Sequence, residues 1–279
     1  MRSSPSLAHA ARRGLLRPAM LAGAAALLGG LVFTTAQAQT SSFEPRVGQA
    51  GKDVVWVPTP QPLVDAMLDL AQAQPADYLI DLGSGDGRTV ITAAKRGLRA
   101  HGIEYNPDMV ELAQRAAQEA GVADRATFEK ADLFESDFSK ASIITMFLLP
   151  SINERLSPKL LDLTPGTRIV SNSFRMGNWE PDDSVVAAED CTRWCNALLW
   201  IVPAKVAGQW QLDGQPLQLQ QTYQVLDGTL GGAALSNAAL RGNAIAFTAG
   251  DARYVGTVSG NRMQGTVEGS GRPWSASRP

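Results

Sequence analysis

The chain has 279 residues, 44% of them hydrophobic and 19% charged, and this ordinary globular composition excludes a disordered or fibrous protein. Without its first 38 residues it loses four arginines and no acidic residue, so its formal net charge falls from −2 to about −6 and, with no basic block, it is a poor candidate for binding nucleic acid. One histidine, His101, then remains, which argues against a Ser-His-Asp hydrolase and a His-rich zinc site, and we predict no metal centre.

The first 38 residues have the pattern of a secretory signal peptide. A basic head with four arginines precedes an apolar stretch over 19–33, and Ala36-Gln37-Ala38 gives a cleavage site before Gln39. A retained membrane anchor is the alternative, but the apolar stretch is short for a span of about 20 residues. The segment "RRGLLR" (12–17) resembles a twin-arginine export signal, with the general secretory route as the other possibility. We expect an exported, periplasmic protein with no stable membrane span after cleavage.

Residues 39–56 are polar and mixed, and we expect a linker or a loosely docked arm. A helix opened by prolines is predicted over 57–72, where Leu63, Met67 and Leu70 recur at helical spacing. Strands and helices then alternate: the expected strands cover 78–82, 100–105, 126–132, 142–149 and 168–174, and the expected helices cover 88–97, 107–121 and 152–163. This alternation is typical of a doubly wound, Rossmann-like α/β domain, which we place at 57–204.

The alternation ends after Phe174. Residues 184–191 and 196–204 are predicted to form an antiparallel hairpin at the edge of the sheet. The two cysteines, Cys191 and Cys195, flank a three-residue loop in which their β-carbons can come close enough for a disulfide, which we favour over two free thiols. From 205 to 279, period-two segments separated by glycine turns predict a small C-terminal antiparallel β domain, a meander or partial barrel. No catalytic constellation is visible in it.

The segment "IDLGSGDGR" (80–88) carries the strongest chemical signal. A strand that runs through three closely spaced glycines into a helix lets the backbone approach a ligand where a β-carbon would collide. A dinucleotide-binding loop requires a third glycine at position 88, which is Arg88, and a phosphate-binding loop requires a lysine that is absent. Asp81 would repel a pyrophosphate and attract an ammonium group. A ligand with an amino-acid end therefore fits better, and S-adenosylmethionine is such a ligand.

Two further strands end in carboxylates suited to the rest of that ligand. Glu104 follows the second strand, where a carboxylate can accept hydrogen bonds from both ribose hydroxyls, and Tyr105 is placed to lie against the adenine. Asp132 follows the third strand, placed to accept from the adenine amino group, with Leu133 as an apolar contact. An acidic residue after one strand is most often a helix cap. Three of them around one crevice predict a nucleoside site.

The strings "DLGSGDGR", "GIEYNP" and "ADLF", in this order and spacing, resemble the class I S-adenosylmethionine-dependent methyltransferases. With "VPTP" upstream, the chain is similar to the small protein-lysine methyltransferases that include the ATP synthase c-subunit lysine methyltransferase, and more distantly to the non-SET histone lysine methyltransferases. The resemblance covers about residues 54–175. The chain departs from this family in two respects: the family is not typically exported with a cleaved signal peptide, and the β domain after residue 205 lies outside the shared part.

The resemblance implies roles for individual residues. The methionine part of the cofactor would be held by Asp81 and by the loop residues Gly83, Ser84 and Gly85. Glu104 would hold the ribose and Asp132 would face the adenine. Pro58 and Thr59 would lie over the methyl end of the cofactor, where the family's V-P-T segment closes the pocket.

The acceptor of the methyl group is less clearly marked than the cofactor. A protein lysine is the first expectation, a small molecule the second, and an exported noncatalytic binding protein that kept the fold the third. Residues 146–151 would line the acceptor's entrance. Glu154 and Asn172 are geometric possibilities for a base, but no catalytic residue is assigned, because displacement at a sulfonium methyl needs positioning more than it needs a strong base.

Overall fold

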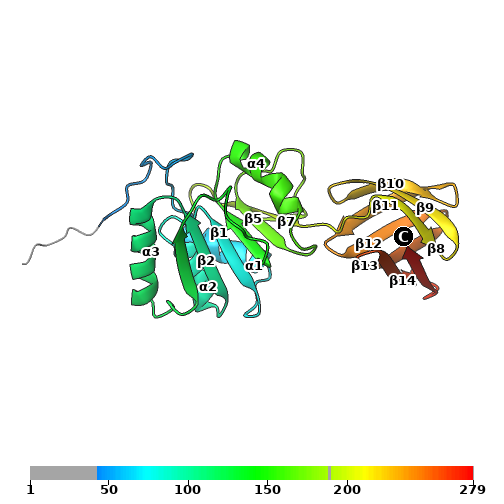
Figure 1. Ribbon diagram of the computed structural model, residues 1–279, viewed down its shortest axis with the longest axis horizontal. Coiled ribbons are helices and arrows are strands. Elements are labelled where there is room, and N and C mark those ends of the chain that lie inside the picture. The colour runs from blue at the N-terminus through cyan, green and yellow to red at the C-terminus, as the bar shows by residue number, and fades with distance from the viewer. Residues whose placement is uncertain (1–42, 188–189, 279) are drawn as a thin grey trace, which may run out of the picture. The chain divides into compact units, whose positions relative to one another are not determined.

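The computed structural model describes residues 43–187 and 190–278. The predicted signal peptide, 1–38, and the first residues of the predicted linker lie outside this part of the chain. The N-terminal part of the described chain is built on a sheet covered by helices (Figure 1). The sheet has seven strands in the order β3-β2-β1-β4-β5-β7-β6. Its strands are β1 (Tyr78–Leu82), β2 (Arg99–Glu104), β3 (Ala126–Lys130), β4 (Ile143–Met146), β5 (Arg168–Asn172), β6 (Asp183–Val186) and β7 (Asn196–Ile201).

The first five strands are parallel, as the alternation of strands and helices predicts. The central strand β1 pairs with β2 on one side and with β4 on the other. The chain therefore builds the sheet outwards from β1 in one direction and then returns to build in the other. In an open α/β sheet, this reversal leaves a crevice at the carboxyl ends of the strands, and ligands bind there.

Within the described residues, four helices cover the two faces of the sheet: α1 (Gln61–Leu70), α2 (Arg88–Lys95), α3 (Pro107–Glu119) and α4 (Pro150–Leu161). Neighbouring residues of β1 point to opposite faces, and Leu79 packs in a core with α1, α2 and α3, whereas Ile80 packs in a second core with α4. Asn106 caps α3, its side chain accepting a hydrogen bond from the Asp108 amide at 2.9 Å. The helix α4 continues through Pro158.

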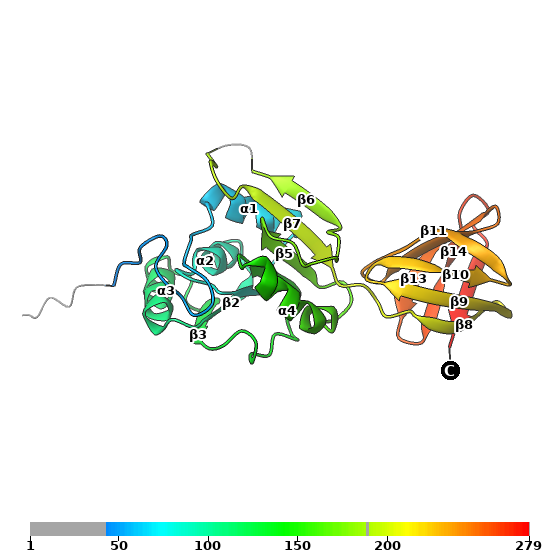
Figure 2. The same ribbon diagram turned by 90° about the horizontal axis from the view of Figure 1, so that it is seen from above.

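The edge of the sheet is the predicted antiparallel hairpin. β7 runs antiparallel to both β5 and β6, and the hairpin lies beside β5 (Figure 2). Cys191 and Cys195 form the expected disulfide in the β6–β7 connection, with their α-carbons 5.7 Å apart. The bond closes a short loop directly before the strand β7.

The C-terminal part is a separate closed barrel of eight antiparallel strands rather than the meander or partial barrel expected. Closure comes from its first and last strands, since Ala276 of β15 pairs with Leu212 of β8. Side chains fill the interior, where Phe247 stacks on Tyr254 with ring centroids 4.9 Å apart. The strands are β8 (Gly208–Leu212), β9 (Gln215–Thr222), β10 (Val225–Leu230), β11 (Ala233–Arg241), β12 (Ala244–Ala249), β13 (Ala252–Ser259), β14 (Arg262–Val267) and β15 (Pro273–Ser277).

No helix within 43–187 or 190–278 is both long enough and apolar enough to cross a lipid bilayer.

A partly buried polar cluster fixes the amino-terminal end of the parallel sheet. Asp77, just before β1, accepts hydrogen bonds from the Ser142 hydroxyl (2.8 Å) and the Gln74 amide (2.8 Å), and it pairs with Arg168 of β5. Arg168 also donates to the Ala71 carbonyl at 2.8 Å. Burial raises the pKa of Asp77, but these hydrogen bonds and the guanidinium outweigh it and hold the pKa below its usual value.

We expect Asp77→Asn to lower the free energy of unfolding at pH 7 by about 1–3 kcal/mol, because it removes a charged acceptor from three donors. The pKa of this carboxyl is lowered on folding, so its contribution is present above about pH 4 and is lost as the pH falls below the unfolded-state value. The difference between parent and variant should therefore shrink in acid. Urea unfolding at about pH 7 and about pH 3.5 measures it. Asp162→Asn, in an exposed pair with Lys205, is the control and should change little.

Candidate functional site

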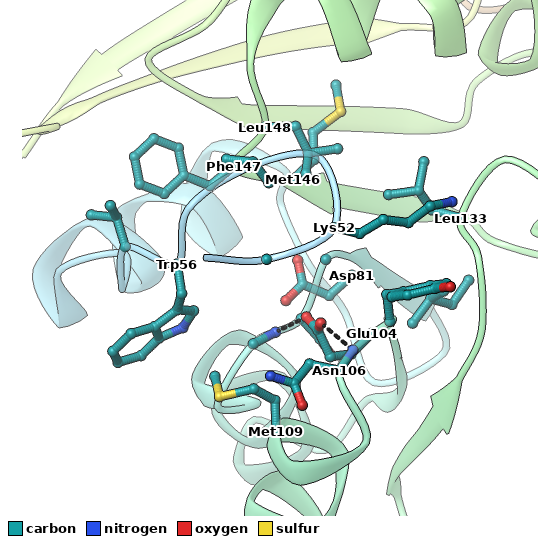
Figure 3. A pocket seen from close by; sticks show the side chains of 18 of the residues that line it. Lys52, Trp56, Asp81, Glu104, Asn106, Met109, Leu133, Met146, Phe147 and Leu148 are labelled. Atoms are coloured by element: carbon teal, nitrogen blue, oxygen red, sulfur yellow. Dashed lines mark hydrogen bonds between the residues drawn. The ribbon is translucent and has the colours of Figure 1, made fainter. Parts of the chain in front are cut away.

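A single pocket at the carboxyl ends of β1, β2 and β4 brings together all ten cofactor-site residues proposed from the sequence (Figure 3). It lies where the sheet reverses direction, as expected for this architecture. The predicted residues that line it are Pro58, Thr59, Asp81, Gly83, Ser84, Gly85, Glu104, Tyr105, Asp132 and Leu133. They come from separate stretches of the chain that only the folded sheet brings together.

The glycine loop between β1 and α2 is closely packed as well as conformationally unusual. Gly85 has a φ of +54°, and a β-carbon there would lie 2.7 Å from the indole nitrogen of Trp56. Gly87 has a φ of +80°, and a β-carbon there would lie 2.7 Å from the ring of Phe128. Gly85 therefore lets another segment approach the pocket, whereas Gly87 lets α2 pack closely on the sheet.

Asp81 is the buried carboxylate of the pocket. It is 6% exposed, and its Oδ1 accepts a hydrogen bond from the Thr145 hydroxyl at 2.7 Å. Burial raises the pKa of Asp81 to about 7, and the nearby Asp86 and Glu104 carboxylates contribute to the rise. Within the described residues no cationic side chain pairs with Asp81. A ligand that brings an ammonium group would supply the missing positive charge.

Glu104 is held by backbone amides on both sides of the crevice. Its Oε2 accepts from the Gly85 amide at 2.9 Å and its Oε1 from the Asn106 amide at 2.9 Å (dashed lines in Figure 3). These bonds fix the carboxylate between the glycine loop and the start of α3. Each carboxylate oxygen has a further lone pair, so Glu104 can still accept from two ligand hydroxyls.

Asp132 lies on the rim of the pocket, and its carboxylate forms an ion pair with a lysine side chain. Its Oδ1 accepts from the Phe134 amide at 2.9 Å, and Lys52 pairs with its Oδ2. Lys52 also lies over the ring of Tyr105, 4.8 Å from the centroid. The hydrogen bond from Lys52 lowers the pKa of Asp132, and the same bond raises the pKa of Lys52. Tyr105 is 46% exposed, so part of its ring is accessible.

The segment expected to be a linker forms one wall of the pocket. Residues 49–59 all line it, and a backbone hydrogen bond from Trp56 to Gln49 folds this stretch back on itself. Arg88, at the position that argued against a dinucleotide loop, donates to the Thr59 carbonyl at 3.0 Å and pairs with Asp86. Sequence reasoning missed Lys52 and Trp56. A tryptophan two residues before the Pro-Thr pair was the signal that could have identified this wall.

The proposed acceptor entrance is apolar. Met146, Phe147 and Leu148, at the end of β4, line the pocket opposite Glu104 (Figure 3), whereas residues 149–151 of the predicted entrance do not line it, because α4 begins there. The two residues considered as bases do not line it. Glu154 lies beside Gly177, and Asn172 is fully buried, with its amide nitrogen 3.3 Å from the Thr59 hydroxyl. Asn172 therefore supports the V-P-T segment.

These groups form a site for a nucleoside with a cationic tail. One buried carboxylate needs a cation, a second can accept from a pair of hydroxyls, and an aromatic face and a third carboxylate lie at the rim. The glycine loop, rather than a lysine or arginine, adjoins the buried carboxylate. This donor set suits S-adenosylmethionine and does not suit a pyrophosphate.

Comparisons with known proteins agree with this geometry. Residues 81–183 match the family model of the ANTKMT methyltransferase domain. A protein-lysine N-methyltransferase of Saccharolobus islandicus is 44% identical over 140 residues, which are 49% of this chain and 86% of that protein. An adenine nucleotide translocase lysine N-methyltransferase of Mus musculus is 38% identical over 120 residues, which are 42% of this chain and 52% of that protein. The match thus spans about half of the mouse protein.

A similar solved structure is named for a different acceptor. It is an RNA methyltransferase from Salinibacter ruber in complex with S-adenosyl-L-homocysteine, 47% identical, with a TM-score of 0.50 over 54% of this chain and 96% of that one. The likeness to this protein and to the lysine methyltransferases supports the methyltransferase fold of this chain and S-adenosylmethionine as its cofactor. The acceptors named for these proteins differ.

The burial of Asp81 predicts that its charged form lowers the free energy of unfolding of the ligand-free protein. Its pKa is raised on folding, so stability falls as the pH rises from about 4 to about 7, and the full cost is present above about pH 7. We expect Asp81→Asn to raise the free energy of unfolding at about pH 8, by up to about 4 kcal/mol, and to have little effect at about pH 4. Urea unfolding at the two pH values measures this. Asp251→Asn, an exposed turn substitution, is the control; an Asp81→Asn protein less stable than the parent at the higher pH would contradict the prediction.

Proposed function

Because the chain belongs to the S-adenosylmethionine-dependent methyltransferases that include the protein-lysine N-methyltransferase of Saccharolobus islandicus, we propose that it methylates the ε-amino group of a lysine in a protein. The observation that carries the cofactor assignment is the convergence of Asp81, Glu104 and Asp132 on one pocket beside the glycine loop. The lysine acceptor rests on the lysine methyltransferases among its relatives.

In this proposal the three carboxylates divide the cofactor between them. Asp81 pairs with the ammonium of the methionine part, which returns its pKa towards that of an ordinary carboxyl. Glu104, oriented by the Gly85 and Asn106 amides, accepts from the ribose hydroxyls. Asp132 and Tyr105 lie at the adenine end. For the adenine amino group to reach Asp132, it must share the carboxylate with Lys52 or displace it.

When bound, S-adenosylmethionine supplies an electrophilic methyl group on a sulfonium. The amine nitrogen forms the new N–CH3 bond as the S–CH3 bond breaks, so the amine must be neutral before it reacts. The apolar side chains of Met146, Phe147 and Leu148 favour the neutral amine, because desolvation lowers the pKa of an ammonium group. The remaining work of the chain is to hold the two reactants in line and exclude water.

RNA is a second candidate acceptor, and one observation favours it: the 47% identical solved structure is named as an RNA methyltransferase. The acidic excess of the chain favours protein over RNA, since nucleic-acid binding depends on clustered basic residues. A small-molecule acceptor is the third candidate. The fate of a labelled methyl group separates the three.

We also propose that the protein is exported to the periplasm. The basic and apolar pattern of residues 1–38 supports export, and so does the Cys191–Cys195 disulfide, because disulfides persist in oxidising compartments. The twin-arginine route would allow the protein to cross already folded around a cofactor made in the cytoplasm.

The acceptor test uses methyl-labelled S-adenosylmethionine with an envelope extract and the purified protein. We expect label in protein, stable to nuclease and located at lysine after hydrolysis. Glu104→Ala should lose about ten-fold or more in affinity for S-adenosylhomocysteine by calorimetry, because it removes charge-assisted hydrogen bonds to the ribose, and should transfer no measurable label. Label found only in RNA or only in small molecules would reject the lysine proposal, and no cofactor binding by the parent would reject the cofactor assignment.

Export is tested with a reporter enzyme that is active only outside the cytoplasm. Fused after residue 42, the reporter should be active, and Arg12→Lys/Arg13→Lys should abolish its activity if the twin-arginine route is used. Activity that survives this double substitution assigns the general secretory route. A silent reporter with the native segment contradicts export.

A further inference from the structure

We propose that Phe147, Phe174 and Trp194 form an aromatic wall along which the acceptor's lysine side chain enters, and that the Cys191–Cys195 disulfide positions this wall. The inference rests on the proposed lysine methylation and adds the residues that recognise the acceptor. It also assigns a role to the disulfide-closed loop, whose residues do not line the cofactor pocket.

The three rings come from different parts of the chain and touch one another. The centroids of Phe147 and Phe174 are 6.0 Å apart, and those of Trp194 lie 5.8 Å from Phe147 and 5.4 Å from Phe174. Phe147 follows β4, Phe174 follows β5 and Trp194 belongs to the disulfide-closed loop. Phe147 also lines the cofactor pocket. The aromatic wall therefore runs without a break from the pocket to the surface at Trp194.

Trp194 is unusual for a large apolar side chain outside a core. It is 37% exposed although it packs on two other rings, and its backbone has a φ of +59°, a conformation that non-glycine residues rarely adopt. The disulfide links the residues on either side of this loop, from Cys191 to Cys195. Packing on Phe147 and Phe174 leaves more than a third of the Trp194 side chain open to solvent. Such features are found where a side chain is presented to a ligand.

Phe174 is also fixed by its surroundings. Asn153, completely buried, donates from its amide nitrogen to the carbonyl oxygens of Phe174 and Arg175, each at 3.2 Å. Ser173, just before it, has a φ of +61°, and the Phe174 amide donates to the Asn172 carbonyl at 2.7 Å. The backbone thus turns sharply after β5 and directs Phe174 against Phe147. This wall is held from two sides.

The chemistry of three aromatic rings fits a lysine and its methylated forms. The methylene stem can pack along the rings, and the ammonium or methylammonium group can lie against the exposed face of Trp194, since the rings are too close together for a cation to enter between them. Because the three rings carry no negative charge that would hold the proton on the amine, the amine can lose its proton readily as it enters the pocket. A phosphate would find no basic side chain among the three rings.

The test measures peptide binding to the full chain saturated with S-adenosylhomocysteine. The probes are Gly-Gly-X-Gly-Gly peptides in which X is trimethyllysine, lysine or norleucine. We expect trimethyllysine to bind more tightly than norleucine by roughly two- to thirty-fold, the range that cation–π contacts give. Trp194→Ala should remove this preference, Trp194→Phe should keep part of it, and Thr192→Ala, in the same loop, should keep all of it. Each variant should bind S-adenosylhomocysteine as the parent does.

The disulfide is tested in the same way. Cys191→Ser/Cys195→Ser should weaken the trimethyllysine preference and raise the KM for labelled acceptor protein, with kcat and cofactor affinity unchanged. The aromatic wall is overturned if the parent binds norleucine peptide as tightly as trimethyllysine peptide, or if Trp194→Ala keeps the parent's preference. The proposed function still stands in that case if label is found in protein lysine. Both the aromatic wall and the proposed lysine methylation are overturned if the parent binds the cofactor but labels no lysine and binds none of the peptides. A Cys191→Ser/Cys195→Ser protein with the full preference overturns the role of the disulfide alone.

Discussion

The pocket depends on one carboxylate buried at the end of the central strand. Asp81 lies where the parallel sheet reverses direction, nearly inaccessible to water and close to two other acidic side chains. Such a group destabilises a protein unless something neutralises it. Throughout the described residues its polar partners are hydroxyls and not cations. A fold that keeps this arrangement is organised around a ligand that brings a positive charge.

The rest of the site follows from that position. Glycines in the adjoining loop leave room beside the carboxylate, and they also leave room for Trp56 from the N-terminal segment. The contacts that tie down that segment include those of Arg88 with Thr59 and of Lys52 with Asp132. Cofactor and acceptor would therefore meet between two walls: a polar one from the parallel strands and an apolar one from β4 and the edge hairpin. For the proposed lysine acceptor, the apolar wall favours the neutral amine, because desolvation lowers the pKa of an ammonium group.

The C-terminal barrel has its own core and adds nothing to the lining of the pocket. Its interior is filled by aromatic and aliphatic side chains, with a β-carbon at Gly256 excluded by the ring of Trp274, 2.6 Å away. The family match ends at residue 183, before the barrel begins. A filled barrel in the same chain as a complete methyltransferase sheet suits a role outside the chemistry of methyl transfer.

The sequence by itself predicted the parallel strands, the helices between them, a disulfide favoured over two free thiols, and ten residues that the structure places in the lining of one pocket. These features are local: a strand, a tight glycine turn and an acidic residue at a strand end are visible within about ten residues, and parallel strands bring their carboxyl ends to one edge. The tertiary structure alone decided that residues 49–56 are a wall and not a linker, that the β domain closes into a barrel, and that Trp194 meets Phe147 and Phe174. Each of these depends on contacts between residues that are distant in the chain or on the pairing of a first strand with a last, and neither periodicity nor spacing records which distant side chains fill the same space.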